Sequence, residues 1–175
     1  MLKAIQLENF KCYENSGLIP LAPITLIFGP NSVGKSTILQ ALYLLMQTRR
    51  FGDPSIPLLF QAENGFVDLG SYEEVVFEHD HENRNIAIRL DVPFERPPVE
   101  HESIGGWYSH VGASTMGLRM EFNRDKQSGE VSLCCCDMLL DEDEEPLTHF
   151  RLIKNGILNP KGMWFCQCGF SVSVR

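Results

Sequence analysis

The stretch Gly29-Pro30-Asn31-Ser32-Val33-Gly34-Lys35-Ser36 determines how this chain of 175 residues is best interpreted. It matches the pattern G-x-x-x-x-G-K-[ST], in which glycines let the backbone wrap closely around phosphate oxygens. Because the pattern can occur by chance, the flanking sequence has to support it. A short apolar run precedes the motif and a long helical pattern follows it, so the sequence predicts a strand, a phosphate-binding loop and a helix.

The predicted loop has the groups needed to hold a nucleoside triphosphate. Its backbone N–H groups and the start of the helix attract phosphate. Lys35 is expected to bridge the β- and γ-phosphates, Ser36 to offer its hydroxyl to Mg²⁺, and Thr37 to lie beside a phosphate. The cofactors expected are therefore ATP and Mg²⁺; GTP remains open, although a guanine-recognition motif is absent. The predicted nucleotide-binding residues are Gly29, Pro30, Asn31, Ser32, Val33, Gly34, Lys35, Ser36 and Thr37.

Three segments around the motif have clear patterns. Leu2 to Leu7 is predicted to be a short strand because apolar and polar residues alternate there. Ile24 to Phe28 is apolar, β-prone and bounded by proline and glycine, which is typical of a strand buried on both faces. Ser36 to Arg50 has apolar residues nearly all round a helix. We expect a sheet to cover this helix on one side and further protein to cover it on the other.

The second half of the chain changes to alternating apolar and polar residues, which is typical of antiparallel strands. Such strands are expected over residues 86–92, 118–123, 131–135 and 148–153. A hairpin turn is expected at 124–129 and a two-residue turn at Asn155-Gly156. The prolines and glycines of 93–117 indicate a long irregular crossing.

Composition narrows the class of protein. Apolar residues make up 43% and charged residues 22%, which suits a folded domain, and no apolar run approaches the ~18 residues of a membrane helix. Since a signal-type apolar segment is also lacking, we expect a cytoplasmic protein without a membrane partner. The net charge of −8 combines a basic excess in 1–52 with an acidic remainder. This balance argues against a broad DNA-binding surface but leaves a local basic groove open.

Other residue types with chemical potential favour ordinary structural roles. Adjacent cysteines in an extended segment point to opposite faces, and a C-x-C pair lacks zinc spacing, so free thiols are expected. His79 and His81 flank Asp80 in a polar stretch that indicates a surface loop. Trp107 and Tyr108 are expected to anchor a core rather than stack on a base. The six cysteines are Cys12, Cys134, Cys135, Cys136, Cys166 and Cys168.

The opening Leu2-x-x-Ile5-x-Leu7-x-Asn9-Phe10-Lys11-Cys12, followed by Pro23 to Asn31, resembles the N-terminal head of RecF/SMC/OLD-type ABC ATPases. Val67 to Phe77 resembles a bacterial AAA-family subgroup. The resemblance implies an α/β P-loop NTPase fold, namely the N-terminal lobe of an ABC-type head with a β-rich antiparallel second half. It also implies that Lys11 and Cys12 lie beside the adenine and ribose. A second ATPase head, as a homodimer, and a nuclease or effector partner are implied as well, with DNA as an open possibility.

Such heads also need a signature segment and an apolar strand ending in Asp-Glu. Gln127-Ser128-Gly129-Glu130 imitates the signature, but its position between two alternating segments favours a hairpin turn. Leu139-Leu140-Asp141-Glu142 imitates the acidic strand end, but Asp137 interrupts the apolar run, and the acids that follow indicate a solvated loop. We therefore assign no catalytic residue and expect this chain alone to hydrolyse ATP barely or not at all.

The resulting expectation is a single partial domain over 1–175. Residues 1–52 supply the strand preamble, the loop and the helix, and 53–175 supply mainly antiparallel strands and loops. The chain would then be a fragment or a truncated gene product. Alternatives are a non-catalytic ATP-responsive interaction module and a small P-loop kinase. The kinase is disfavoured because 53–117 holds few arginines for a lid, namely Arg84, Arg89 and Arg96.

Overall fold

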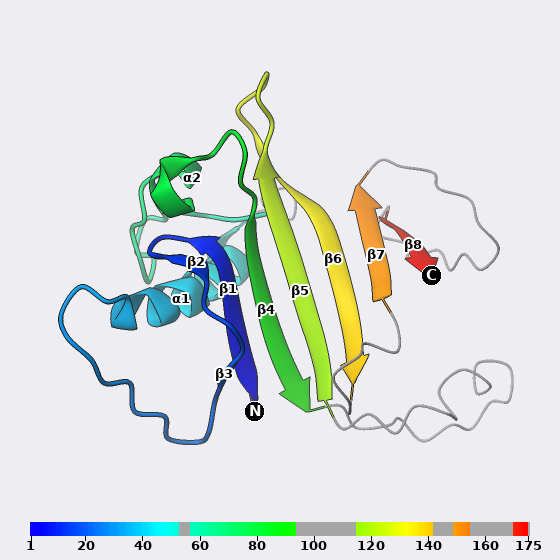
Figure 1. Ribbon diagram of the computed structural model, residues 1–175. Coiled ribbons are helices and arrows are strands. Elements are labelled where there is room, and N and C mark those ends of the chain that lie inside the picture. Colours follow the sequence, from blue (N-terminus) through cyan, green and yellow to red (C-terminus); the bar gives the residue numbers. More distant parts are fainter. Residues whose placement is uncertain (53–56, 94–114, 142–148, 155–169, 175) are drawn as a thin grey trace, which may run out of the picture.

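The computed structural model describes residues 1–52, 57–93, 115–141, 149–154 and 170–174. These residues form one antiparallel sheet with a single long helix against it (Figure 1). The strand order is β2-β1-β4-β5-β6-β7-β8, and β3 also pairs with β1. The helices are α1 (Lys35–Phe51), α2 (Tyr72–Val75) and the 3₁₀ turn η1 (Phe77–His79). The strands are β1 (Ala4–Phe10), β2 (Tyr13–Asn15), β3 (Ile19–Pro20), β4 (Ile86–Pro93), β5 (Thr115–Arg124), β6 (Val131–Asp141), β7 (His149–Lys154) and β8 (Phe170–Val174).

Helix α1 confirms the helix predicted from the apolar pattern. It begins directly after Gly34, and Arg49 and Arg50 lie in its last turn, where they face the negative end of the helix dipole. The helix ends where the Gly52 N–H donates to the Thr48 carbonyl oxygen at 2.9 Å. No helix in the described ranges is long and apolar enough to cross a membrane.

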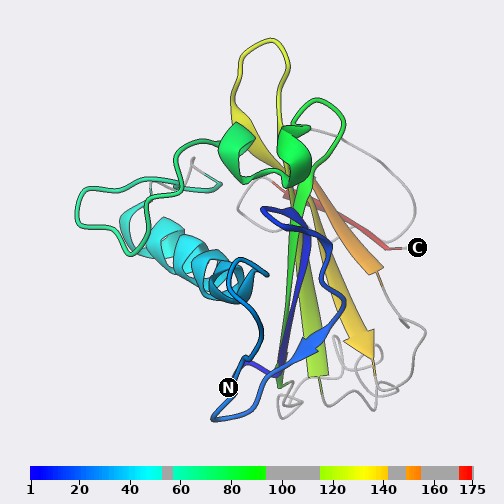
Figure 2. The ribbon, with the colours of Figure 1, turned by 60° about the vertical axis from the view of Figure 1, so that its left-hand side comes forward.

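The core lies between α1 and one face of the sheet, which Figure 2 shows nearly edge-on. Ile5 and Leu7 of β1 are fully buried there, as the period of a strand requires. Asn9 adopts a left-handed φ of 52°, which interrupts the alternation of buried and exposed side chains along β1. The next buried side chain is therefore Phe10 instead of Asn9. The helix contributes its own buried stripe to this cluster, Ile38, Ala41 and Leu44.

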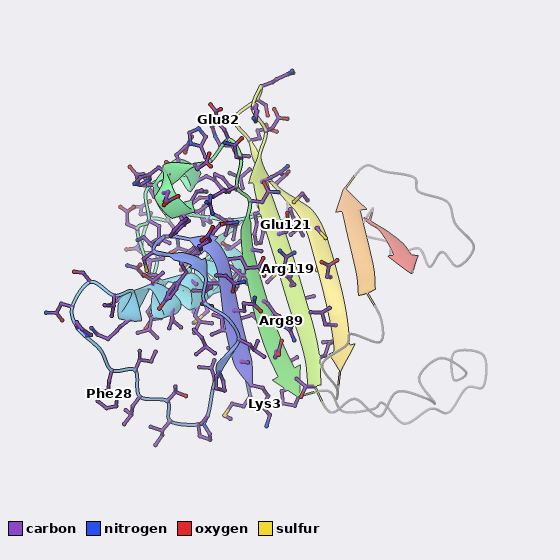
Figure 3. The ribbon with its side chains drawn as sticks, viewed as in Figure 1. Lys3, Phe28, Glu82, Arg89, Arg119 and Glu121 are labelled. Carbon is purple, nitrogen blue, oxygen red and sulfur yellow. The ribbon has the colours of Figure 1, made fainter. Side chains whose placement is uncertain are left out.

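The opposite face of the sheet carries ion pairs within β5 and from β5 to β1 and β6. The Arg119 guanidinium lies 2.6 Å from the Glu8 carboxylate, 2.9 Å from Glu121 and 3.7 Å from Asp137. Hydrogen bonding to Glu8 is the largest factor that raises the pKa of Arg119. In Figure 3, Arg119 and Glu121 lie on β5 with Arg89 on the neighbouring β4. Asp137 is therefore compatible with a strand here, because Arg119 on the adjacent β5 pairs with it.

Several boundaries differ from the sequence prediction. The first strand runs from Ala4 to Phe10 instead of 2–7, and β6 continues beyond Cys135 to Asp141. Residues 115–117 belong to β5 rather than to an irregular crossing, and β8 was not anticipated. The predicted strands at 86–92 and 148–153 are confirmed to within a few residues. Outside the described residues lie Pro54, Arg96, Trp107, Tyr108, Glu142, Asn155, Gly156, Cys166 and Cys168.

The largest correction concerns Ile24 to Phe28, which was predicted to be a buried strand. The segment has no strand assignment, and the exposed fractions of Ile24 and Phe28 are 81% and 83%. Phe28 lies on the extended loop between β3 and α1, away from the sheet (Figure 3). A strand buried on both faces belongs to a sheet that is covered on both sides. The described strands instead pair antiparallel with one another and leave this segment unpaired.

Candidate phosphate-binding site

A pocket of about 360 Å³ lies where the β1–β2 turn meets the motif loop and the start of α1. Its lining brings together the two groups of residues that the sequence singled out separately. Lys11 and Cys12 come from the turn, and the loop and helix supply Asn31, Ser32, Gly34, Lys35, Ser36 and Thr37. Gly29, Pro30 and Val33 belong to the predicted set but do not line the pocket. Gln40 lines it and was not predicted.

Gly34 links the motif loop to the helix and is closely surrounded. Its φ is 93°, a backbone conformation that side chains rarely adopt. A Cβ at this position would overlap Cys12 Sγ and lie 3.2 Å from the Tyr13 ring. The Tyr13 hydroxyl donates to the Gly34 carbonyl oxygen at 3.3 Å. Burial, and to a lesser extent the Cys12 thiol, raises the pKa of Tyr13, so this donor stays protonated.

The Lys35 ammonium lies over the motif loop. It donates to the Gly29 carbonyl oxygen at 2.9 Å and also to the Pro30 carbonyl oxygen. These contacts are exposed to solvent, so a phosphate oxygen can replace the carbonyls as the partner of Lys35. The sequence expectation that this lysine reaches phosphates held by the loop stays a prediction.

Two hydroxyls follow Lys35 on the first turn of α1. Ser36 is exposed, whereas Thr37 is buried and its N–H donates to the Gly34 carbonyl oxygen at 3.0 Å. Thr37 Oγ1 lies 3.6 Å from Cys12 Sγ, which ties the helix start to the β1–β2 turn. The first turn of α1 carries no acidic residue, so the positive end of the helix dipole is not neutralised there.

The electrostatic character of the pocket follows from its lining. Lys11 and Lys35 are its charged residues, and the remaining lining residues are uncharged. The donor set is therefore ammonium groups, hydroxyls, amides and loop N–H groups, which suits a polyanion. ATP fits this set through its phosphates. The Ser36 hydroxyl would hold Mg²⁺.

The other stretches that imitate ATPase motifs lie elsewhere in the sheet. Gln127 and Ser128 belong to the turn between β5 and β6, where their N–H groups donate to the Asp125 carboxylate. These hydrogen bonds hold the pKa of Asp125 below its usual value, and the bond from the Ser128 N–H has the largest effect. Asp141 pairs with Thr115 at the end of antiparallel β6, so it does not end a parallel strand beside the loop.

The histidines near Asp80 contact backbone. His79 Nδ1 lies 2.9 Å from the Glu73 carbonyl oxygen, and His81 Nδ1 lies 3.1 Å from that of His79. Within the part of the chain that the structure describes, no group of three or more histidine, cysteine or acidic residues could hold a metal ion.

Comparison with known proteins identifies the family to which the chain belongs. Residues 1–160 match the family model described as AAA ATPase domain. The chain is 52% identical to the OLD nuclease of Thermus scotoductus over 96 residues, which are 54% of this chain and 15% of that protein. It is 33% identical to the DNA replication and repair protein RecF of Roseiflexus castenholzii over 103 residues, which are 58% of this chain and 25% of that protein.

These matches confirm the resemblance to P-loop ATPases of the RecF/SMC/OLD type. The RecF of Protochlamydia amoebophila is 37% identical over 74 residues, which are 41% of this chain and 21% of that protein. The chain thus spans a quarter or less of the length of these curated relatives.

Proposed function

We propose that this chain, which belongs to the AAA ATPase domain family, binds ATP together with Mg²⁺ in the pocket around Lys35. The observation that carries the proposal is the convergence of Lys11 and Lys35 on a pocket whose other lining residues are uncharged. Phosphates are the anionic groups of ATP, and loops of this type hold them with N–H groups, one lysine and a hydroxyl on Mg²⁺.

The proposed roles follow the geometry of the loop. Lys35 exchanges its contacts with the Gly29 and Pro30 carbonyls for the β- and γ-phosphates. Ser36 offers its exposed hydroxyl to Mg²⁺, and Thr37 lies beside a phosphate. Lys11 and Cys12 border the nucleotide from the β1–β2 turn.

We propose binding rather than turnover for this chain alone. Hydrolysis of a phosphoanhydride needs a group that orients the attacking water and further charge around the transferred phosphoryl group. The residues described around the pocket include no carboxylate. Loss of a general base alone typically costs ~10²–10⁴ in rate. Bound ATP should therefore persist for hours, as judged by chromatography of the nucleotide recovered from the protein.

Calorimetry with Mg-ATP on the wild-type chain and on Lys35→Ala tests the binding site. The wild type should bind, and the variant should lose at least tenfold in affinity because a charge-assisted phosphate contact is removed. Lys126→Ala serves as the matched control, since Lys126 is an exposed lysine in the β5–β6 turn. Equal affinities for the wild type and Lys35→Ala, or no binding by either, would refute the assignment.

We further propose that residues 1–175 form one partial P-loop ATPase domain, the N-terminal lobe of an ABC-type head that pairs with a second head. The relatives are an OLD nuclease and a DNA replication and repair protein, which favours a role in anti-phage defence or DNA repair with a nuclease or effector partner. A non-catalytic, ATP-responsive interaction module is the second candidate, because the described pocket lacks a carboxylate. If a longer chain dimerised in the presence of ATP and hydrolysed it, this result would favour the ATPase head over the interaction module.

A further inference from the structure

The lining of the pocket contains a contact between two elements. Lys11 Nζ donates to Gln40 Oε1 at 3.1 Å, joining the β1–β2 turn to the second turn of α1. Both side chains are half-buried and both line the pocket. Gln40 follows Ser36 by four residues, so the two lie on the same side of the helix.

The backbone that carries Lys11 is held in an unusual conformation. Its φ is 53°, which is uncommon for a residue with a side chain and costs free energy unless the surroundings impose it. The Lys11 N–H donates to the Val75 carbonyl oxygen at 2.6 Å, and Phe10 forms a bridge with Val76. The turn is therefore fixed against α2, and the Lys11 side chain is directed from there toward α1.

We propose that Gln40 is a positioning residue that holds the Lys11 ammonium in the pocket so that its charge acts on the phosphates of the bound nucleotide. This inference rests on the proposed function and adds a residue to it. A glutamine accepts a hydrogen bond from an ammonium group without neutralising it, because the amide is uncharged. Gln40 therefore holds the ammonium group without adding a counter-charge, and the anionic groups of ATP are its phosphates.

Four methionine variants test the proposal by calorimetry with Mg-ATP. Gln40→Met and Lys11→Met remove one partner each and keep much of its length, and a double variant removes both. Leu39→Met is the matched control, since Leu39 is its neighbour on α1, is 52% exposed and does not line the pocket. We expect about tenfold weaker binding for Lys11→Met, because a charged contact with phosphate is lost. We expect about threefold weaker binding for Gln40→Met, because the Lys11 ammonium is no longer held in position.

The double variant carries the decisive result. Because Gln40 acts through Lys11, the double variant should bind within about twofold of Lys11→Met alone, a departure from additivity expected of residues in contact. The dependence of affinity on salt concentration should also become shallower in Lys11→Met and in Gln40→Met, but not in Leu39→Met, because a charge–phosphate contact is screened by salt. A merely structural role of Gln40 would leave that slope unchanged.

The outcomes separate this inference from the proposed function. If the wild type and Leu39→Met bind Mg-ATP and Lys35→Ala binds it at least tenfold more weakly, the proposed nucleotide site is supported. An unchanged affinity in Gln40→Met, or additive losses in the double variant, then overturns the role of Gln40 alone. Magnesium tripolyphosphate provides a second probe, since Lys11→Met should weaken the binding of tripolyphosphate as much as the binding of ATP. If Lys11→Met weakened the binding of ATP but not of tripolyphosphate, Lys11 would lie at the nucleoside, and this result would also overturn the inference.

Discussion

At the scale of single residues, Gly34 combines a left-handed backbone with close neighbours. Gly34→Ala forces a Cβ onto a φ of 93° and into contact with Cys12 Sγ. We expect it to lower the free energy of unfolding by about 1–3 kcal/mol, as measured by urea denaturation. The same substitution in a Cys12→Ala background should cost less, since the contact with sulfur is removed while the backbone strain remains. An equal cost in both backgrounds would show that Cys12 does not restrict this position.

The sequence could name the residues of the motif loop because a local backbone conformation and a fixed spacing define them. Lys11 entered the prediction only through resemblance, and Gln40 did not enter it at all. Their contact joins residues that are 29 apart in the sequence, and it depends on how the β1–β2 turn lies against α1. Neither residue belongs to a local spacing motif that links the two, so the sequence carries no signal for the pair.

At the scale of elements, α1 fixes the segment that follows it through Gln47. This side chain is fully buried, and its Oε1 accepts from the N–H groups of Phe66 and Val67 at 3.0 and 3.1 Å. Its Nε2 donates to the Leu59 carbonyl oxygen at 2.5 Å. Gln47→Met keeps the volume but leaves these backbone groups without their partner. We expect a loss of about 2–4 kcal/mol in urea denaturation, whereas Gln61→Met, at an exposed position, should change stability by less than about 0.5 kcal/mol.

The same scale explains which elements were predictable. Helix α1 and the β5–β6 hairpin follow from periodicity and turn residues within one short segment. Whether Ile24 to Phe28 forms a strand depends on neighbours contributed by other segments, and the described strands do not provide them. The continuation of β6 through Asp137 was missed for a related reason, because the partner Arg119 lies on the adjacent strand. Local periodicity therefore predicted elements within one segment but not the pairing between distant segments.

At the scale of the whole molecule, one side of α1 and the preceding segment expose apolar side chains. The sequence predicted protein on both sides of this helix. Among the described residues, the sheet covers one side, and the other side leaves Leu39 and Met46 52% exposed and Tyr43 41% exposed. Phe66 covers part of this side by stacking on Tyr43 with ring centroids 6.1 Å apart. Ile24, Leu26 and Phe28 add further exposed apolar area.

Exposed apolar area of this kind binds hydrophobic dyes and promotes association. We expect the 175-residue chain to enhance the fluorescence of an anilinonaphthalene dye and to self-associate at high protein concentration, as measured by sedimentation. The double variant Leu39→Lys with Met46→Glu should reduce both effects at least twofold, because it places charges on the uncovered side of α1 without touching the core. Gln61→Lys with Gln127→Glu adds the same charges at exposed polar positions and should leave both effects unchanged. Equal dye binding by the two double variants would mean that the uncovered side of α1 is not the source.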